Sequence, residues 1–598
     1  MRDTSAPAPP EPTGWQAATL ARDAKWDSAS RVVLAVAALI SYARLFLGVD
    51  VTDESFYNAA PYAFALGNTP YSDELNIAQN GAILLTPLFK LYHLAVGSST
   101  GVVLFNRHLY FALLAGCGWL AYRVAAAHLN RPFARLLTAF TLTFSYFNIP
   151  SLSYNTLGAF FLFGGIFLLL LHMAPGVRRR RHLIVFAANT CFIATAFAHP
   201  SLLFAALAGL AASLTLAWRA DPSHRAAWLA SLGLGGLAAL AFFAWIGQAR
   251  LNDALTYARS YDFDIWASAP RSAMSIWNQL RHVGTVYFPG FAALLALSIL
   301  PAGSFRNSRL LFSSVAPVMA ATILYLLHRH PTLVYYPAGS APLIQSFGGA
   351  LLPLLLLLPD RKHAWQLAKV VALPCLVGTA ILAFTSTNRL HATPITLFPA
   401  ATCALLVVGL VAQTIDRDQA SNRARMAAAM GVLVAIVAFQ GVCLLERSYR
   451  DAPFEEGGPV FAPGPFAGIL TNEPNARRLA AMRADLASLA AGGARTVFSY
   501  DDFPAGYLLS PLRPRTFSTW IFWPHDPAVG QKLLARVFDA ANPPDVVLRT
   551  MPPLTYAVDY EMKRLNYKMH LMRTDLRYAV FVRDGATIPP SPVPLRHD

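Results

Sequence analysis

Charged residues are scarce in this chain. Only 13% of its 598 residues are charged and 55% are hydrophobic, whereas soluble proteins usually carry about 25% charged residues. The mean hydropathy is +0.42. This composition excludes an ordinary soluble protein and predicts that most of the chain lies within a membrane.

The polar segments also lack cysteine, and the N-terminus lacks the pattern of a cleaved signal peptide. All five cysteines fall inside apolar stretches, so they are interpreted as packing residues without a disulfide or thiolate–metal role. The first thirty residues are rich in Pro and Ala, and no short apolar stretch with a small-residue cleavage site follows them. Residues 1–30 are therefore predicted to form a disordered cytoplasmic tail.

Apolar stretches of spanning length recur between residues 31 and 446 and predict about thirteen membrane spans. They lie near 31–49, 101–122, 135–149, 155–173, 183–198, 201–218, 226–246, 285–302, 310–327, 341–358, 365–384, 393–414 and 426–446. With a cytoplasmic N-terminus, most of the +16 formal net charge falls in inner segments, including the run Arg178–Arg181. This is the positive-inside pattern, so the basic excess indicates orientation and not nucleic-acid binding.

Three segments are too long or too polar to be simple connectors. Two are outer loops at about 50–100 and 247–284, and the second is typical of amphipathic helices at a membrane interface. The third covers residues 447–598 and predicts a periplasmic α/β domain, with helices over 472–491 and 526–541 and strands over 496–502, 545–550 and 578–584. The predicted fold is a polytopic α-helical membrane protein with a C-terminal extracytoplasmic α/β domain.

Acidic residues are few between residues 31 and 446, so their positions are informative. The first outer loop holds two adjacent pairs, Asp53-Glu54 and Asp73-Glu74. Asp53-Glu54 follows the first span directly, where a partly shielded carboxylate can act as a general base toward a hydroxyl group. The alternatives are a solvated loop acid or the N-cap of a helix that starts at Ser55.

Cationic and imidazole side chains lie at the predicted outer ends of several spans: Arg107, His199, Arg259, His330 and Arg389. Ionisable groups at the ends of apolar helices are costly unless they have partners. Their convergence on one outer face would suit a phosphate group, which Arg binds through paired hydrogen bonds. The alternative for each of them is that it reaches toward lipid headgroups.

These features together resemble the GT-C glycosyltransferases, which use polyprenyl-phosphate sugars and include protein O-mannosyltransferases and the lipid A aminoarabinose transferase. The local resemblance covers about residues 50–125, where DESFY, LGNTPYSDE and VLFNRHLYFALL are similar to the family's acid pair, its G-x-P-Y-x-D stretch and its Arg-containing second span. Two places depart from the pattern. Gln79-Asn80-Gly81 replaces a Lys-Pro-Pro stretch, and Tyr154-Asn155 replaces a Pro-Asp that opens a later span.

The resemblance implies inverting transfer of a hexosyl or pentosyl group at the periplasmic face of a bacterial inner membrane. The donor would be a polyprenyl-phosphate-linked sugar, and the acceptor an envelope glycan, lipid or protein. The resemblance also implies roles for individual residues: Asp53 as general base, Glu54 orienting the acceptor or exchanging roles with Asp53, and Arg389, Arg259, His199 and His330 binding the donor phosphate. Asp73 and Glu74 would contact the acceptor or a divalent metal. The need for a metal stays open, and no other cofactor is implied.

Other classes of protein remain as alternatives. An O-antigen ligase or polymerase also pairs cations with a lipid phosphate, but it needs no acid pair directly after the first span. A transporter or flippase for lipid-linked glycans would be expected to show charges in mid-span and internal symmetry.

In the outer domain, Tyr500, Phe503, Tyr507, Trp520 and Trp523 are candidates for sugar stacking, although core packing is favoured for most of them.

Overall fold

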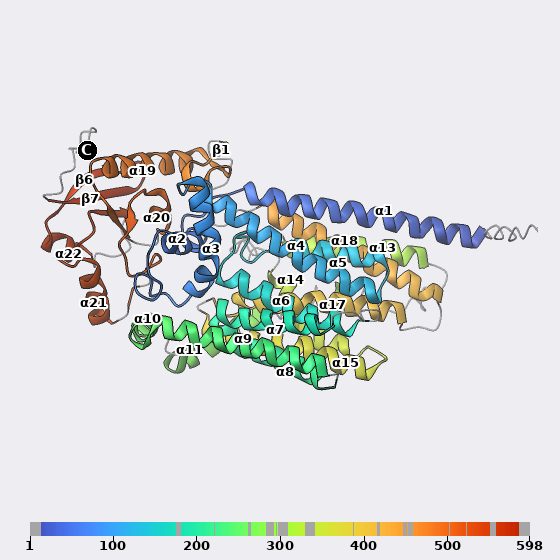
Figure 1. Ribbon diagram of the computed structural model, residues 1–598. Coiled ribbons are helices and arrows are strands. Elements are labelled where there is room, and N and C mark those ends of the chain that lie inside the picture. Colours follow the sequence, from blue (N-terminus) through green and yellow to red (C-terminus); the bar gives the residue numbers. More distant parts are fainter. Residues whose placement is uncertain are drawn as a thin grey trace, which may run out of the picture.

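The computed structural model describes residues 14–174, 181–219, 222–260, 265–282, 292–294, 296, 309–328, 341–386, 388–414, 419–446, 451, 458–500, 503–521, 523–524, 526–550 and 558–584. Figure 1 shows a long bundle of helices with a smaller domain at one end. The domain contains a five-stranded sheet. The chain is thus a polytopic helical membrane protein with a C-terminal α/β domain, as the sequence predicts.

The bundle is built from apolar helices, of which nine in the described part of the chain are long and apolar enough to cross a membrane. Its elements are α1 (Gly14–Ala43), η1 (Arg44–Phe46), α4 (Val102–His128), α5 (Arg131–Leu142), α6 (Tyr154–Met173), α7 (Arg181–Ala198), η2 (Pro200–Leu202), α8 (Leu203–Arg219), α9 (Pro222–Ile246), α13 (Arg309–His328), α14 (Ala341–Leu355), α15 (Arg361–Leu367), η5 (Ala368–Ala372), α16 (Leu373–Thr385), η6 (Arg389–Ala392), α17 (Pro394–Thr414) and α18 (Gln419–Glu446). The predicted spans fall on these helices with two exceptions. The span 135–149 is only partly helical, because α5 ends at Leu142 and its 12 residues are too few to cross a bilayer. The span 285–302 lies largely outside the described residues.

One sequence prediction about the bundle is wrong. Helix α1 begins at Gly14, so residues 14–30 are helical, although the composition of the first thirty residues predicted disorder. The helix extends well beyond its apolar part, which starts near residue 31. Residues 1–13 lie outside the described residues.

The helices differ in how much of their surface faces the interior. Helix α17 is central, because 94% of the residues in its apolar stretch are buried. Helix α9 is peripheral, because only 11% of the residues in its apolar stretch are buried. A helix that is apolar on all sides is suited either to the middle of a bundle or to a lipid-facing position. Helices α17 and α9 are both apolar on all sides, so their positions depend on packing against neighbours and not on their own composition.

The predicted inner loops meet at one end of the bundle. The ring of His128 at the end of α4 lies 6.0 Å from the ring of His363 in α15. The rings of His172 in α6 and His224 in α9 are 5.2 Å apart. This end of the bundle lies away from the sheet domain (Figure 1), as the predicted alternation of inner and outer loops requires.

The C-terminal sheet has the strand order β4-β3-β5-β7-β6. Strand β3 (Thr496–Tyr500) is parallel to β4 (Arg513–Pro514) and β5 (Val546–Thr550), while β7 (Tyr578–Arg583) is antiparallel to β5 and to β6 (Tyr567–Arg573). The strands β3, β5 and β7 fall where the sequence predicted them. Strand β6 was missed because Lys, His and Arg interrupt its apolar residues in the sequence YKMHLMR, as is common at a sheet edge.

The other elements of the domain are α19 (Glu473–Ala491), α20 (Ala505–Leu509), α21 (Pro527–Val537), α22 (Asp559–Arg564), η7 (Gly464–Phe466) and the strand pair β1 (Pro459–Phe461) and β2 (Leu470–Asn472). Helices α19 and α21 confirm the two predicted helices. The amide of Asn475 donates to the side chain of Asn472 at 2.9 Å, so Asn472 is the predicted N-cap of α19.

Four helices lie where the bundle meets the domain: α2 (Asp53–Ala65), α3 (Gln79–Val96), α10 (Gln248–Ser260) and α11 (Ile265–His282). A second apolar core joins the first outer loop, α10 and the sheet domain through Tyr71, Tyr257 and Phe517. Backbone hydrogen bonds also cross this junction, from Ala505 to Val51 at 3.2 Å and from Gly48 to Leu470 at 2.8 Å. The domain is therefore packed directly on the membrane part.

Helix α3 approaches α6 at Gly81 so closely that no side chain fits. A Cβ atom at Gly81 would lie 2.8 Å from the backbone N and Cα of Tyr154. We expect Gly81→Ala to separate the two helices and to cost roughly 1–3 kcal/mol of stability, measured as a lower Tm of the purified protein.

The matched control is Gly116→Ala in α4, where a Cβ would meet no atom within 4 Å. This substitution should raise stability slightly, by less than about 1 kcal/mol, because alanine favours the helix. Equal Tm values for the two variants would contradict the close approach at Gly81.

Candidate active site

The segment between the first span and α2 places two acids in the first turn of α2. Gly48 has a φ of 75°, a left-handed conformation that glycine adopts without steric cost. The carboxylate of Asp50 accepts hydrogen bonds from the amides of Thr52, at 2.9 Å, and Glu54, at 2.8 Å. Asp50 therefore caps α2 in place of an N-cap side chain, and the helix begins with Asp53 and Glu54.

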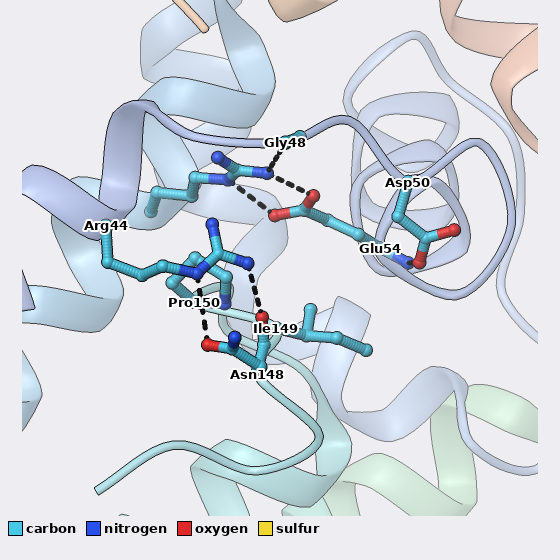
Figure 2. A pocket seen from close by; sticks show the side chains of 8 residues that line it. Arg44, Gly48, Asp50, Glu54, Asn148, Ile149 and Pro150 are labelled. Carbon is cyan, nitrogen blue, oxygen red and sulfur yellow. Dashed lines mark hydrogen bonds and ion pairs between the residues drawn. The ribbon is translucent and has the colours of Figure 1, made fainter. Parts of the chain in front are cut away.

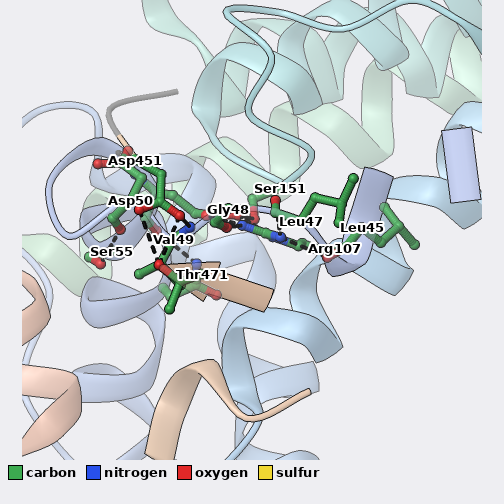
Figure 3. A network of polar contacts seen from close by, with 12 residues as sticks. Leu45, Leu47, Gly48, Val49, Asp50, Ser55, Arg107, Ser151, Asp451 and Thr471 are labelled. Atoms are coloured by element: carbon green, nitrogen blue, oxygen red, sulfur yellow. Dashed lines mark hydrogen bonds and ion pairs between the residues drawn. The ribbon is translucent and has the colours of Figure 1, made fainter. Parts of the chain in front are cut away.

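Glu54 is held by a buried arginine on the second membrane helix. The Arg107 Nε and Nη2 atoms donate to the two oxygens of Glu54 at 2.7 and 2.6 Å, and each side chain is 1% exposed. The Ser151 hydroxyl also donates to Glu54. Figure 3 shows Arg107 and Ser151 beside the loop that leads from the first span to α2.

The remaining N–H groups of Arg107 hold that loop. Nη1 donates to the carbonyls of Leu45 and Leu47 at 2.7 and 3.2 Å, and Nη2 donates to the carbonyl of Gly48 at 2.7 Å. A guanidinium has five N–H donors, so all of them are used. Arg107 is thus not a phosphate ligand, and Glu54, predicted to be catalytic, is bound in a way that favours a positioning role.

A second buried arginine lies beside this pair. Arg44 donates from Nε to the side chain of Asn148 at 3.0 Å and from Nη2 to its carbonyl at 2.7 Å (Figure 2). Arg44, Arg107, Glu54 and Asp50 line a small cavity of about 10 Å³, roughly the space that one water molecule needs. Ligand pockets usually measure about 300–1,000 Å³, so this cavity is too small for a lipid-linked sugar. The residues that line it hold the acids in position.

Asp451 ties the same loop to the C-terminal domain. Its carboxylate accepts from the amide of Val49 at 2.8 Å, the hydroxyl of Thr471 at 2.9 Å and the side chain of Asn475 at 2.7 Å. Figure 3 shows Asp451 close to Asp50 and Thr471. The start of α2 is therefore fixed from both parts of the molecule.

Asp53 lies on a helix face that carries aromatic rings. Tyr57 is one turn further along α2, and its ring lies 6.1 Å from that of Tyr154. The charge of Asp53 also acts on Tyr154. The ring of Tyr154 lies 5.1 Å from that of His199. The structure thus brings together two of the predicted site residues, Asp53 from the first outer loop and His199 from the turn between α7 and α8.

His199 has a buried nitrogen without a hydrogen bond to the described residues. The side chain is 6% exposed, and its Nδ1 atom has no partner among the residues that the structure describes. Buried polar atoms nearly always have a partner in protein or bound solvent.

The other predicted phosphate ligands are less closely grouped. Arg389 lies in η6, where its Nη1 atom donates to the carbonyl of Phe384 at 3.1 Å. Helix α16 contacts both η6 and η2, the turn that follows His199. Arg259 is exposed in the last turn of α10. His330 lies outside the described residues.

The two departures from the family pattern meet in space. Gly81 packs on the backbone of Tyr154, and the hydroxyl of Tyr71 donates to the side chain of Asn80. Asn155 donates to the hydroxyl of Tyr57 at 3.5 Å, which places it beside the aromatic group near Asp53. Separate stretches of sequence gave no sign of this contact, because it depends on how α3 packs on α6.

Asp73 and Glu74 differ in their hydrogen-bond partners. The carboxylate of Asp73 accepts from the amide of Thr69 at 2.8 Å within its own loop. Glu74 is 1% exposed, and it accepts from the amide and hydroxyl of Thr519 at 2.7 and 2.6 Å. Burial raises the pKa of Glu74. Glu74 was predicted to contact the acceptor or a metal, but it holds the C-terminal domain on the first outer loop.

The described residues contain no group of three or more His, Cys, Asp or Glu side chains that could hold a metal ion. A divalent metal bound by Asp73 and Glu74 therefore receives no support from these side chains.

Three residues that hold the site in position were missed in the sequence: Arg44, Asp50 and Asn148. The signal for Arg44 and Asp50 was their position at the end of the first apolar stretch, where ionisable residues need partners.

Comparisons with known proteins find similarity in structure only. No protein-family model matches the chain, and no curated protein matches it. ArnT from Cupriavidus metallidurans, bound to undecaprenyl phosphate, aligns at a TM-score of 0.40 and 12% identity over 94% of this chain and 99% of that chain. Archaeal oligosaccharyltransferase AglB from Archaeoglobus fulgidus, in complex with an inhibitory peptide and a dolichol-phosphate, aligns at 0.44 and 13% over 95% and 75%.

At such identities and TM-scores, the similarity assigns no role to any residue of this chain. The roles considered for Asp53, Glu54, His199 and the other side chains rest on their own surroundings.

The pair formed by Arg107 and Glu54 leads to a test of stability. We expect Arg107→Met to lower the stability of the protein by about 3–5 kcal/mol, because it leaves a buried carboxylate without its cation. Arg107→Lys should lower the stability almost as much, because an ammonium group has three hydrogen-bond donors and the guanidinium uses five. The measurement is the Tm of the purified protein.

A matched control is Arg123→Met on the same helix, where the guanidinium lies over the ring of Trp119 at 5.5 Å. That substitution should change stability by no more than about 1 kcal/mol. A wild-type Tm for Arg107→Lys would show that the paired geometry is not needed.

Asp50 leads to a test of pH dependence. Burial and the nearby charge of Asp53 raise the pKa of Asp50 to about 7, from an ordinary value of about 3.9. Between these values the folded protein keeps a proton that the unfolded chain loses, so the contribution of Asp50 to stability falls as the pH rises. Wild-type Tm should therefore fall between about pH 4 and about pH 7.

Asp50→Asn should flatten this part of the pH profile, because asparagine does not titrate. Its single side-chain oxygen can keep only one of the two amide hydrogen bonds at the start of α2, so a lower Tm at all pH values is also expected. The control is Asp526→Asn, which changes the N-cap of α21 and should keep the wild-type slope. An unchanged slope in Asp50→Asn would contradict the raised pKa.

Proposed function

We propose that this protein is an inverting glycosyltransferase that uses a polyprenyl-phosphate-linked sugar, with Asp53 as the general base. The observation that carries the proposal is the first turn of α2. There, Asp53 is 9% exposed and lies next to Glu54, which Arg107 holds in place. The resemblance of residues 50–125 to the GT-C glycosyltransferases supports the same function.

The surroundings of Asp53 suit a general base. The positive end of the helix dipole at the start of α2 stabilises a carboxylate. Burial and the charge of Asp53 raise the pKa of Asp50 to about 7, so the two carboxyl groups interact electrostatically across the start of α2.

The proposed reaction is a direct displacement. Asp53 takes the proton from the acceptor hydroxyl, and the oxygen attacks the anomeric carbon from the face opposite the phosphate. The bond between that carbon and the phosphate oxygen breaks, and the polyprenyl phosphate leaves with the bonding electrons. The leaving anion needs positive charge or hydrogen-bond donors.

The candidates for this second task are His199, Arg389, Arg259 and His330. His199 has the strongest support, because its ring contacts Tyr154 and its buried Nδ1 atom lacks a partner in the described part of the chain. Arg389 is next, since α16 contacts both the turn after His199 and the η6 element that holds Arg389. Glu54 and Arg107 keep Asp53 in position and do not contact the donor.

The proposed orientation places the C-terminal domain in the periplasm and the N-terminus in the cytoplasm. The ends of α4, α6, α9 and α15 that carry the arginine-rich loops meet away from the sheet domain. Lys and Arg gather on the cytoplasmic side of membrane proteins. The acceptor would then be an envelope glycan, lipid or protein.

The test is complementation of a deletion strain. We expect the strain to accumulate a polyprenyl-phosphate sugar and to lack one envelope product, both measured by mass spectrometry of lipid extracts and envelope glycans. Asp53→Asn should fail to restore the product, because general-base catalysis contributes about 10²–10⁴-fold. Its amount in the membrane should stay normal.

The control is Asp253→Asn in α10, which is 51% exposed and pairs with Arg536 at 3.4 Å. It should restore the product fully. Full restoration by Asp53→Asn would contradict the proposal, and a deletion strain with unchanged polyprenyl-phosphate sugars would favour the ligase or the transporter.

A further inference from the structure

Trp520 extends from the C-terminal domain onto the helix that carries Asp53. Its ring lies 5.2 Å from the ring of Phe56, and Phe56 is three residues after Asp53 in α2. Side chains three apart on a helix are neighbours, with about 5–6 Å between their Cβ atoms. These two contacts place the indole of Trp520 on the part of α2 that neighbours Asp53.

Most other aromatic residues of the domain are not available to a ligand. Tyr500, Phe503 and Tyr507 are 1%, 2% and 3% exposed, which confirms core packing for them. Trp523 packs on Tyr500 at 5.5 Å. Trp520 is, like Trp523, only partly buried, and its ring also contacts Phe56 of α2 across the junction with the membrane part.

The backbone of Trp520 is held rigidly. The preceding residue, Thr519, donates its amide and hydroxyl to the buried carboxylate of Glu74. The hydroxyl of Ser518 donates to the carbonyl of Trp520 at 2.7 Å, and the amide of Leu75 donates to the carbonyl of Phe517 at 2.8 Å. A fixed backbone means that little side-chain freedom is lost when the ring binds a partner.

The face of α2 that carries Asp53 therefore has an aromatic ring on each side. Phe56 and Tyr57 flank Asp53 at the i+3 and i+4 positions. Trp520 lies against Phe56, and Tyr154 lies against Tyr57. The first ring comes from the C-terminal domain and the second from the membrane helix α6, so the two sides of Asp53 are built by different parts of the chain.

We propose that Trp520 is the binding surface for the acceptor and that the acceptor is a carbohydrate. This inference rests on the proposed function, because it concerns the same site. The side of Asp53 nearest to Tyr154 and His199 opens toward the membrane helices, where a lipid-linked donor must lie. The acceptor hydroxyl then reaches Asp53 from the side of the C-terminal domain.

A carbohydrate is the class of acceptor that fits this surface. A pyranose ring has a face of C–H groups that packs on a flat aromatic ring, while its hydroxyls stay at the edge. Indole offers a large rigid apolar face with a single donor at its edge. The hydroxyl that Asp53 deprotonates would lie at the edge of the sugar that stacks on Trp520.

The test measures binding without turnover, using saturation-transfer-difference NMR on the full chain in lipid nanodiscs. Nanodiscs avoid the sugar headgroups of maltoside detergents. The probes are the methyl glycosides of glucose, galactose and mannose, and the blocked dipeptide acetyl-Ser-Thr-amide. We expect at least one glycoside to receive saturation on the C–H protons of one ring face, and the dipeptide to receive none.

Trp520→Ala should lower this signal about two- to ten-fold, as expected for the loss of one aromatic stacking contact. Trp520→Phe should restore part of it. The matched control is Tyr560→Ala, which removes an aromatic side chain that is 73% exposed elsewhere on the domain and should leave the signal unchanged. Comparable expression and Tm of the variants exclude misfolding as the cause.

Two results would overturn the inference: an unchanged glycoside signal in Trp520→Ala, or saturation of the dipeptide with none of any glycoside. Its failure can be told apart from failure of the proposed function. Asp53→Asn should bind the glycoside normally and lose only the envelope product, so loss of binding in Trp520→Ala stands even if Asp53 proves not to be the base.

Discussion

The five hydrogen-bond donors of Arg107 determine how this site is built. Two of them bind Glu54, and three bind carbonyls of the loop that joins the first span to α2. A buried carboxylate is tolerated only with a cation and hydrogen bonds around it. The position of α2, and with it the position of Asp53, therefore depends on an arginine that lies on another membrane helix.

The same loop is also held by the C-terminal domain. Asp451 binds Val49 and Thr471, while Glu74 binds Thr519. A catalytic group works only if its geometry is fixed by surrounding contacts. Here the contacts come from both the membrane helices and the sheet domain, so the domain contributes to the site and does not merely cover it.

Acidic residues at this site have distinct roles, although they are close in sequence. Asp50 caps α2, Asp53 faces the aromatic rings of Tyr57 and Tyr154, and Glu54 pairs with Arg107. Separate surroundings give chemically similar groups different charge states and tasks. The pKa of Asp50 is raised to about 7 by burial and by the charge of Asp53, so the two neighbouring carboxyl groups interact.

The sequence by itself determined the membrane class, the end of the bundle at which the arginine-rich loops gather, the main elements of the C-terminal domain and the importance of the acid pair after the first span. These follow from composition and local periodicity, which act over short stretches of chain. Only the tertiary structure decided that Glu54 is paired with Arg107, that Glu74 holds the domain, and that Tyr154 lies against both Tyr57 and His199. Such contacts join residues up to several hundred positions apart, and they depend on how helices pack and on which buried charges find partners, neither of which is encoded locally.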